Sequence, residues 1–202
     1  MRKINEDTVV IATHNQGKLL EISALFSKFN LNVISVSNFN LKEPKETEDT
    51  FIGNARIKAH FAAKNSNSLS MSDDSGIMVD GLNGAPGVYT ADWATTEDGR
   101  DFNHAMTRVW TLLEKNKIAS PRTAHFICVL CLAWPDGHDE VFEGKVSGRI
   151  TWPMRGKNGF GFDPIFIPDG HKKTFGEMNQ DKKHKMSHRS IAFGKLVNAC
   201  LS

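Results

Sequence analysis

The stretch TVVIATHNQGK, residues 8–18, decides the fold class of this chain. Residues 8–12 are apolar and mostly β-branched, which predicts a short buried strand. Residues 13–17 are polar and end in glycine, which predicts a turn. A helix should begin near Lys18 and extend to about Phe29, with apolar residues along one face. A buried strand that turns into an amphipathic helix indicates an α/β protein.

The remaining segments continue this mixture of strands and helices. The PDGH sequence at residues 135–138 predicts a hairpin turn between two long strand-like runs, so some antiparallel pairing is expected. Gly and Pro predict loops at residues 83–87 and 156–168, and the polar segment 38–49 is also expected to be a loop. We expect further strands at 33–36, 69–71, 77–79, 123–134 and 141–152, and further helices at 50–64, 101–117 and 187–201.

The composition limits the class of protein. A length of 202 residues with 40% hydrophobic content suits a single globular domain over residues 1–202, with room for two lobes. The 25 basic and 23 acidic residues nearly cancel, which gives no reason to expect binding to nucleic acid or to a membrane. No apolar run reaches membrane-span length, and residues 1–7 lack the apolar core of a signal peptide. The odd count of three cysteines favours a reducing, cytoplasmic location.

Cys128 and Cys131 form a C-x-x-C sequence inside a predicted buried strand. Residues three apart on a strand face opposite sides of the sheet, and no second pair completes a zinc site. We therefore expect both cysteines to pack in the core.

The SDDSG segment at residues 72–76 carries the clearest chemical signal. One of the adjacent carboxylates, Asp73 and Asp74, could hold a divalent cation while its neighbour accepts a proton from water. Ser75 and Gly76 would let the backbone approach an anionic ligand. Taken alone, the segment favours a solvated turn, because Asp, Ser and Gly are the usual turn residues.

Three other segments each have a functional and a structural interpretation. Residues 13–18 place polar groups and Lys18 at a helix N-terminus, which suits a phosphate but equally suits a plain helix cap. Residues 159–166, GFGFDPIF, could stack phenylalanines on a planar base, or they could form a loop held in the core by its aromatics. Ser187 is a credible N-cap, after which His188 and Arg189 could donate to purine keto oxygens or phosphates, or form a solvated first turn.

The order of these segments resembles that of the inosine triphosphate pyrophosphatase family, also called the non-canonical purine NTP pyrophosphatases. The resemblance covers nearly the whole chain. The similar motifs are Thr13-x-Asn15-x-x-Lys18, Asp73-Asp74-Ser75-Gly76, Gly84-Ala85-Pro86-Gly87, Gly159-Phe160-Gly161-Phe162-Asp163-Pro164 and Ser187-His188-Arg189.

The resemblance implies a magnesium-dependent homodimer that cleaves ITP, dITP or XTP into the monophosphate and pyrophosphate. It implies an elongated mixed β-sheet flanked by helices, with two lobes and a central substrate cleft. The implied catalytic residues are Asp74 as proton acceptor, with Asp73 and Lys18, and the implied Mg²⁺ ligands are Asp74 and Glu46. The implied substrate contacts are Thr13, His14, Asn15, Gln16, Gly17, Lys18 and Lys183 for phosphate, Ser75 for the substrate, Phe160, Gly161, Phe162 and Asp163 for the base, and His188 and Arg189 for the keto group.

A few positions depart from the usual pattern of this family. Lys45 precedes Glu46 where many relatives are acidic, and Gly53 stands where some carry a glutamate. Phe162 replaces a more usual Tyr or Trp, and Asp92 stands where an arginine is common.

Two alternative functions stay open. One is a pyrophosphatase for another modified or canonical nucleotide, and the other is a nucleotide-binding sensor or scaffold without turnover. The intact Asp73–Asp74 pair and Lys18 argue against the second.

Overall fold

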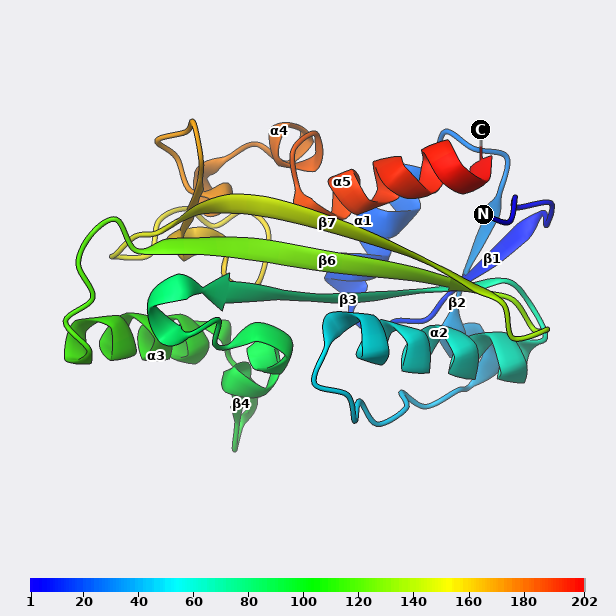
Figure 1. Ribbon diagram of the computed structural model, residues 1–202, viewed down its shortest axis with the longest axis horizontal. Helices are drawn as coiled ribbons and strands as arrows, with labels where there is room; N and C mark the ends of the chain where they lie inside the picture. Colours follow the sequence, from blue (N-terminus) through cyan, green and yellow to red (C-terminus); the bar gives the residue numbers. More distant parts are fainter. Residues whose placement is uncertain (202) are drawn as a thin grey trace. The chain divides into compact units, whose positions relative to one another are not determined.

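The computed structural model describes residues 1–201 and contains a mixed sheet flanked by helices (Figure 1). The six-stranded sheet has the order β2-β1-β3-β6-β7-β8, and a separate two-stranded sheet pairs β4 with β5. The strands are β1 (Thr8–Ile11), β2 (Asn32–Ser35), β3 (Ser70–Val79), β4 (Thr95–Thr96), β5 (Gly99–Arg100), β6 (Thr123–Ala133), β7 (Asp139–Ile150) and β8 (Phe166–Pro168). The helices are α1 (Gln16–Phe26), α2 (Phe51–Ser66), α3 (Phe102–Lys115), α4 (Gln180–His184) and α5 (His188–Leu196).

The pairing of the strands confirms the predicted α/β class with a mixed sheet. β1 pairs in parallel with both β2 and β3, whereas β7 and β8 are antiparallel. No helix within residues 1–201 is long and apolar enough to cross a membrane.

The chain forms two compact units. Unit 1 contains residues 1–74, 128–144 and the chain from residue 189 onward, and unit 2 contains residues 75–127 and 145–188. The arrangement of one domain with a cleft between two lobes stays a prediction, and each unit is described below by itself.

The core of unit 1 is built by the alternation of side chains along its strands. Val9 and Ile11 of β1 pack into one cluster with residues of α1 and α5, whereas Val10 of β1 and Ala12, directly after the strand, pack into another cluster with α2. Successive strand residues point to opposite faces of a sheet. The helices α1 and α5 therefore cover one face of this part of the sheet and α2 covers the other, as Figure 1 shows for α5 and α2.

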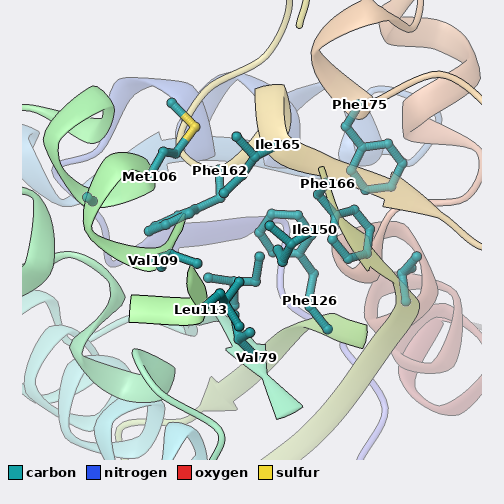
Figure 2. Packing of buried hydrophobic residues seen from close by; sticks show 14 of the residues in the cluster. Val79, Met106, Val109, Leu113, Phe126, Ile150, Phe162, Ile165, Phe166 and Phe175 are labelled. Carbon is teal, nitrogen blue, oxygen red and sulfur yellow. The ribbon is translucent and has the colours of Figure 1, made fainter. Parts of the chain in front are cut away.

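The core of unit 2 lies between α3 and the strand segments that belong to this unit (Figure 2). Phe126 of β6 packs edge-on against Phe166 of β8, with ring centroids 4.7 Å apart. Phe175 stacks near the same ring, and Val109 and Leu113 of α3 complete the cluster. Aromatic side chains of this size contribute strongly to the apolar area that folding buries.

The structure differs from the predicted elements mainly at polar positions. The SDDSG segment is no solvated turn, because it lies within the ten-residue strand β3, with Asp73 and Asp74 buried. The helix α1 begins before Lys18, since Asn15 caps it by accepting a 3.1 Å hydrogen bond from the Lys18 amide. The short helix α4 was not predicted, and it begins with polar residues.

The cysteine prediction is confirmed. Cys128 and Cys131 are both buried, free thiols on β6. No cluster of three or more His, Cys, Asp or Glu side chains in the described part of the chain could hold a metal ion.

Candidate active site

The alternation along β3 sends the two adjacent aspartates to opposite faces of the sheet. Asp73 meets Lys18 of α1 and Arg189 of α5, whereas Asp74 meets Lys58 of α2. Ser72 lies on the same face as Asp74, and its hydroxyl donates a 2.6 Å hydrogen bond to a carbonyl of α2. The two carboxylates are therefore separate groups in different surroundings.

Asp73 is the centre of a buried ionic network. Its Oδ1 lies 2.6 Å from Lys18 Nζ, and its Oδ2 accepts a 2.7 Å hydrogen bond from Arg189 Nε. The thiol of Cys128 also donates to Oδ2, at 3.2 Å. Burial alone would raise the pKa of Asp73, but Arg189 and Lys18 hold this pKa well below its ordinary value. Asp73 therefore stays ionised near neutral pH and anchors the two cations, which makes it unsuited to accept a proton.

Arg189 lies behind this carboxylate. Its side chain is 2% exposed, and its Nη1 donates to Glu21 of α1. Arg189 thus joins Asp73 to Glu21, and the geometry favours a role in holding Asp73. Its direct contact with a purine keto group stays a prediction.

The sequence interpretation missed Glu21 altogether. The visible signal was a glutamate among the apolar residues of the predicted helix face, because an acidic side chain there needs a buried partner.

The first turn of α1 positions Lys18. Thr13 Oγ1 accepts a 3.2 Å hydrogen bond from the Asn15 amide, and Asn15 in turn caps the helix. The ring Nε2 of His14 lies 3.0 Å from the carbonyl oxygen of Leu41, in the loop between β2 and α2. Lys18 therefore projects from a capped helix N-terminus, where the helix dipole and its own charge both favour an anion. Gln16 and Gly17 lie in the same first turn.

On the other face of the sheet, Lys58 joins the two carboxylates expected to bind metal. Its Nζ lies 2.6 Å from Glu46 Oε1 and 2.7 Å from Asp74 Oδ1. The sequence interpretation did not single out this lysine. Its position among alanines of the apolar face of α2 was the available signal, because a lysine is almost never fully buried without a partner.

Asp74 has the surroundings of a general base. Burial raises the pKa of Asp74 to about 6, although Lys58 and Lys18 act in the opposite direction. Its Oδ2 is buried and has no hydrogen-bond partner among residues 1–201. A carboxylate with a pKa close to neutral and an oxygen that no protein group hydrogen-bonds is suited to take a proton from water.

The same groups fit one divalent cation. Mg²⁺ binds through one or two carboxylates and completes its coordination with water and phosphate oxygens. Glu46 and Asp74 provide two carboxylates, and their oxygens Oε1 and Oδ1 already hold one cation, the ammonium of Lys58. The structure also explains why glycine stands at position 53, where some relatives of the resembling family carry a glutamate. A Cβ at this position would lie only 2.5 Å from the Cβ of Glu48.

In unit 2, a second buried ion pair shapes the Gly-Phe loop. Asp163 Oδ2 accepts hydrogen bonds from Lys183 Nζ at 2.7 Å and from the Phe160 amide at 2.9 Å. A Cβ on Gly159 would approach the same oxygen to 1.9 Å, and the φ of Gly159 is +75°, so only glycine fits. The Lys183 side chain is 2% exposed, so its ammonium lies buried against Asp163 and does not face solvent.

The two phenylalanines of the loop have different surroundings. Phe162 is 1% exposed and packs in the core of unit 2 (Figure 2), edge-on to Phe102 at 5.9 Å. Its predicted stacking on a base is therefore not available in this structure, and it plugs the loop into the core instead. Phe160 is half-buried beside Gly161, with Lys183 Nζ 5.1 Å from its ring centre. Phe160 is the better candidate for stacking.

The remaining predicted contacts of unit 2 are largely buried. The ring of His188 is 6% exposed and stacks on Phe126 at 4.9 Å, with an interplanar angle of 11°. Ser187 is buried just before α5, and Ser75 is half-buried on β3. His188 is therefore oriented by an aromatic face before any ligand binds.

The sequence and the fold of this chain are similar to those of known proteins. A sequence model of the Ham1 family matches residues 9–199. A dITP/XTP pyrophosphatase of Ruegeria pomeroyi is 55% identical over 98% of each chain, and one of Agrobacterium fabrum is 51% identical over 100% of this chain and 99% of its own. The solved structure of a HAM1 protein from Coxiella burnetii has a TM-score of 0.87 at 33% identity, covering 96% of this chain and 98% of that one. A nucleoside-triphosphatase / dITP/XTP pyrophosphatase from Mycobacterium abscessus has a TM-score of 0.77 at 33% identity, covering 94% and 98%.

Proposed function

Because the chain belongs to the Ham1 family, we propose that it hydrolyses non-canonical purine nucleoside triphosphates, such as ITP, dITP and XTP, to the monophosphate and pyrophosphate. The curated relatives bearing this activity in their names match at about half identity over essentially full length. The observation that carries the proposal is Asp74, whose open buried oxygen and pKa of about 6 suit a base that activates water.

In this proposal, Asp74 accepts a proton from the water that attacks the triphosphate. The bond between the α- and β-phosphates breaks, and the pyrophosphate leaves with additional negative charge. Lys18, at the N-terminus of α1, and Lys58, on α2, offer positive charge to phosphate oxygens. Asp73 acts indirectly, because it holds Lys18 and Arg189 in place.

We propose that Glu46 and Asp74 bind one Mg²⁺. Such an ion would polarise a phosphoryl oxygen and reduce the charge that builds up during hydrolysis. Glu46→Gln should then raise the Mg²⁺ concentration needed for half-maximal rate, and Glu48→Gln is the matched control. An unchanged titration for Glu46→Gln, together with a shift for Glu48→Gln, would move the metal ligand to Glu48.

For the base, we propose that Phe160 provides a stacking surface and that His188 donates a hydrogen bond to the keto group. The pair of Lys183 and Asp163 would hold the Phe160 loop in shape, since Asp163 bonds both the lysine and the Phe160 amide. The proposal extends to a cytoplasmic homodimer that binds neither nucleic acid nor membrane.

Release of pyrophosphate tests the proposal directly. ITP, dITP, XTP, ATP and GTP are incubated with the protein, with and without Mg²⁺, and Asp74→Asn is the control. We expect release from the first three substrates that depends on Mg²⁺ and on Asp74. Release mainly from another nucleotide would indicate a different preferred base, and nucleotide binding without any release would indicate a sensor.

A further inference from the structure

We propose that Lys58 occupies the place of the metal ion in the nucleotide-free protein, so that metal and nucleotide bind together and the metal binds poorly by itself. This inference rests on the proposed function, because it concerns the metal and phosphate ligands of the same site. It assigns Lys58 a part in controlling metal binding, in addition to its proposed contact with phosphate oxygens.

The bridging geometry of Lys58 is the basis of this inference. One ammonium group lies within hydrogen-bond distance of both carboxylates, at 2.6 Å from Glu46 Oε1 and 2.7 Å from Asp74 Oδ1. The Lys58 side chain is 5% exposed and that of Asp74 is 8% exposed, so water screens their attraction little. A cation between two carboxylates is the arrangement that a bound divalent ion would otherwise provide.

The lysine is also held in this place by its helix. Ala55, Ala59 and Ala62 on the same stretch of α2 are all 0% exposed. Small buried neighbours let the aliphatic stem of Lys58 run through the interior while its ammonium reaches the carboxylates. The position of the charge is therefore built into the packing of α2.

A divalent ion that approaches Glu46 and Asp74 would meet this resident charge. Two like charges a few ångströms apart repel strongly where water is excluded, so binding of the ion alone is disfavoured while Lys58 stays. The triphosphate removes this obstacle, because its oxygens can accept the N–H donors of Lys58. Once Lys58 moves to the phosphate, Glu46 Oε1 and Asp74 Oδ1 become available to the ion, whereas Asp74 Oδ2, without a partner among residues 1–201, stays available to accept a proton from water.

Such an exchange makes the binding of metal and nucleotide mutually dependent. If the nucleotide raises the affinity for the metal, the metal must raise the affinity for the nucleotide by the same factor. Replacing Lys58 by an uncharged side chain should remove much of this dependence, because the site then binds the ion without first displacing a cation.

The test measures binding and does not require turnover. Mn²⁺ is used as the probe, and its binding is followed by electron paramagnetic resonance in wild type, Lys58→Met and Lys64→Met. Lys64 lies on the same helix and is exposed, so Lys64→Met is the matched control. Without nucleotide, we expect Lys58→Met to bind Mn²⁺ at least about tenfold more tightly than wild type, since it lacks the neighbouring positive charge. Lys64→Met should match wild type.

A second set of titrations contains an ITP analogue with a methylene bridge between its α- and β-phosphates. The analogue should raise the Mn²⁺ affinity of wild type by a larger factor than that of Lys58→Met. Equal Mn²⁺ affinity of wild type and Lys58→Met without nucleotide would overturn the inference.

A measurement on wild type covers the case in which Lys58→Met does not fold. The ammonium resonance of Lys58 is followed by nuclear magnetic resonance, with Mg²⁺ alone and with Mg²⁺ plus the analogue. We expect the chemical shift of this resonance to change only when Mg²⁺ and the analogue are both present. A change of the shift with Mg²⁺ alone would contradict the inference. If these binding results hold but no nucleotide is hydrolysed, the proposed function fails and the inference stands. If nucleotide is hydrolysed but these binding results are not obtained, the inference fails and the proposed function stands.

Discussion

Replacing Asp74 by asparagine should reduce activity and increase stability at the same time. The amide has the shape of the carboxylate but cannot accept a proton from water, and losing a positioned base costs about 10²–10⁴-fold in rate. The loss of a metal ligand would add to this decrease. Near-native kcat in the folded variant at saturating Mg²⁺ would refute the role of Asp74 as base.

The gain in stability follows from the raised pKa of Asp74. In the folded protein this pKa is about 6, mainly because of burial, against 3.8 in the absence of such an environment. The folded state therefore holds its proton more tightly than the unfolded state, so ionisation of Asp74 weakens folding as the pH rises from about 4 to about 6. Above pH 6 the full penalty of about 3 kcal/mol applies, and Asp74→Asn removes it.

Thermal unfolding at several pH values measures this penalty. At pH 8, Asp74→Asn should melt above wild type by up to about 6–12 °C, which is the range that about 3 kcal/mol represents in a chain of this size. The difference should shrink below pH 6 and vanish near pH 4. The acid limb of kcat/KM in wild type should fall near pH 6, since this parameter reports the nucleotide-free protein. A variant that melts below wild type at pH 8 would refute the assigned pKa.

Three further experiments test the other parts of the site. Arg189→Ala should destabilise the fold by about 3–5 kcal/mol in denaturant titrations, since it removes a buried cation that Glu21 and Asp73 share and leaves Asp73 with Lys18. A stable variant in which only the ratio of ITP to ATP hydrolysis collapses would restore its role as base reader. Phe160→Leu should raise KM for ITP without lowering the melting temperature, whereas Phe162→Leu should mainly lower stability; the reverse pattern would exchange their roles. Cys128→Ala should lower kcat/KM for ITP a few-fold, about the effect of one modest hydrogen bond, while Cys131→Ala, on the opposite face of β6, should not; equal effects would indicate a packing defect.

The sequence predicted elements well where apolar residues repeat regularly. The strands β1, β6 and β7 and the helices α2 and α3 were found to within a few residues, because their periodicity is local information. The SDDSG segment was assigned wrongly when taken alone, since its polar composition is typical of turns. What holds it within a strand are partners far away in the chain, such as Arg189, which is 116 residues from Asp73.

In the candidate site too, residues in local motifs were predicted from the sequence, whereas residues defined by distant partners were not. The motif residues Lys18, Asp73 and Asp74 were identified from their order and from the family resemblance. Lys58 and Glu21 were not identified, because a single charged residue on an apolar helix face does not reveal its partner. Only the packing of α1, α2 and α5 on the sheet brings Lys58 to Asp74 and Glu21 to Arg189.

The opposite orientation of Asp73 and Asp74 also limits how the gene can change. Because neighbouring strand residues alternate between faces, deleting or inserting one codon in the first half of β3 would shift both carboxylates by one residue. A deletion would place Ser75 opposite Lys58, and an insertion would place Ser72 opposite Arg189, so in either case one of the two positions would lose its carboxylate. Natural length variation should therefore avoid residues 70–74 and occur instead in exposed segments that hold no site residue, such as the turn at residues 135–138.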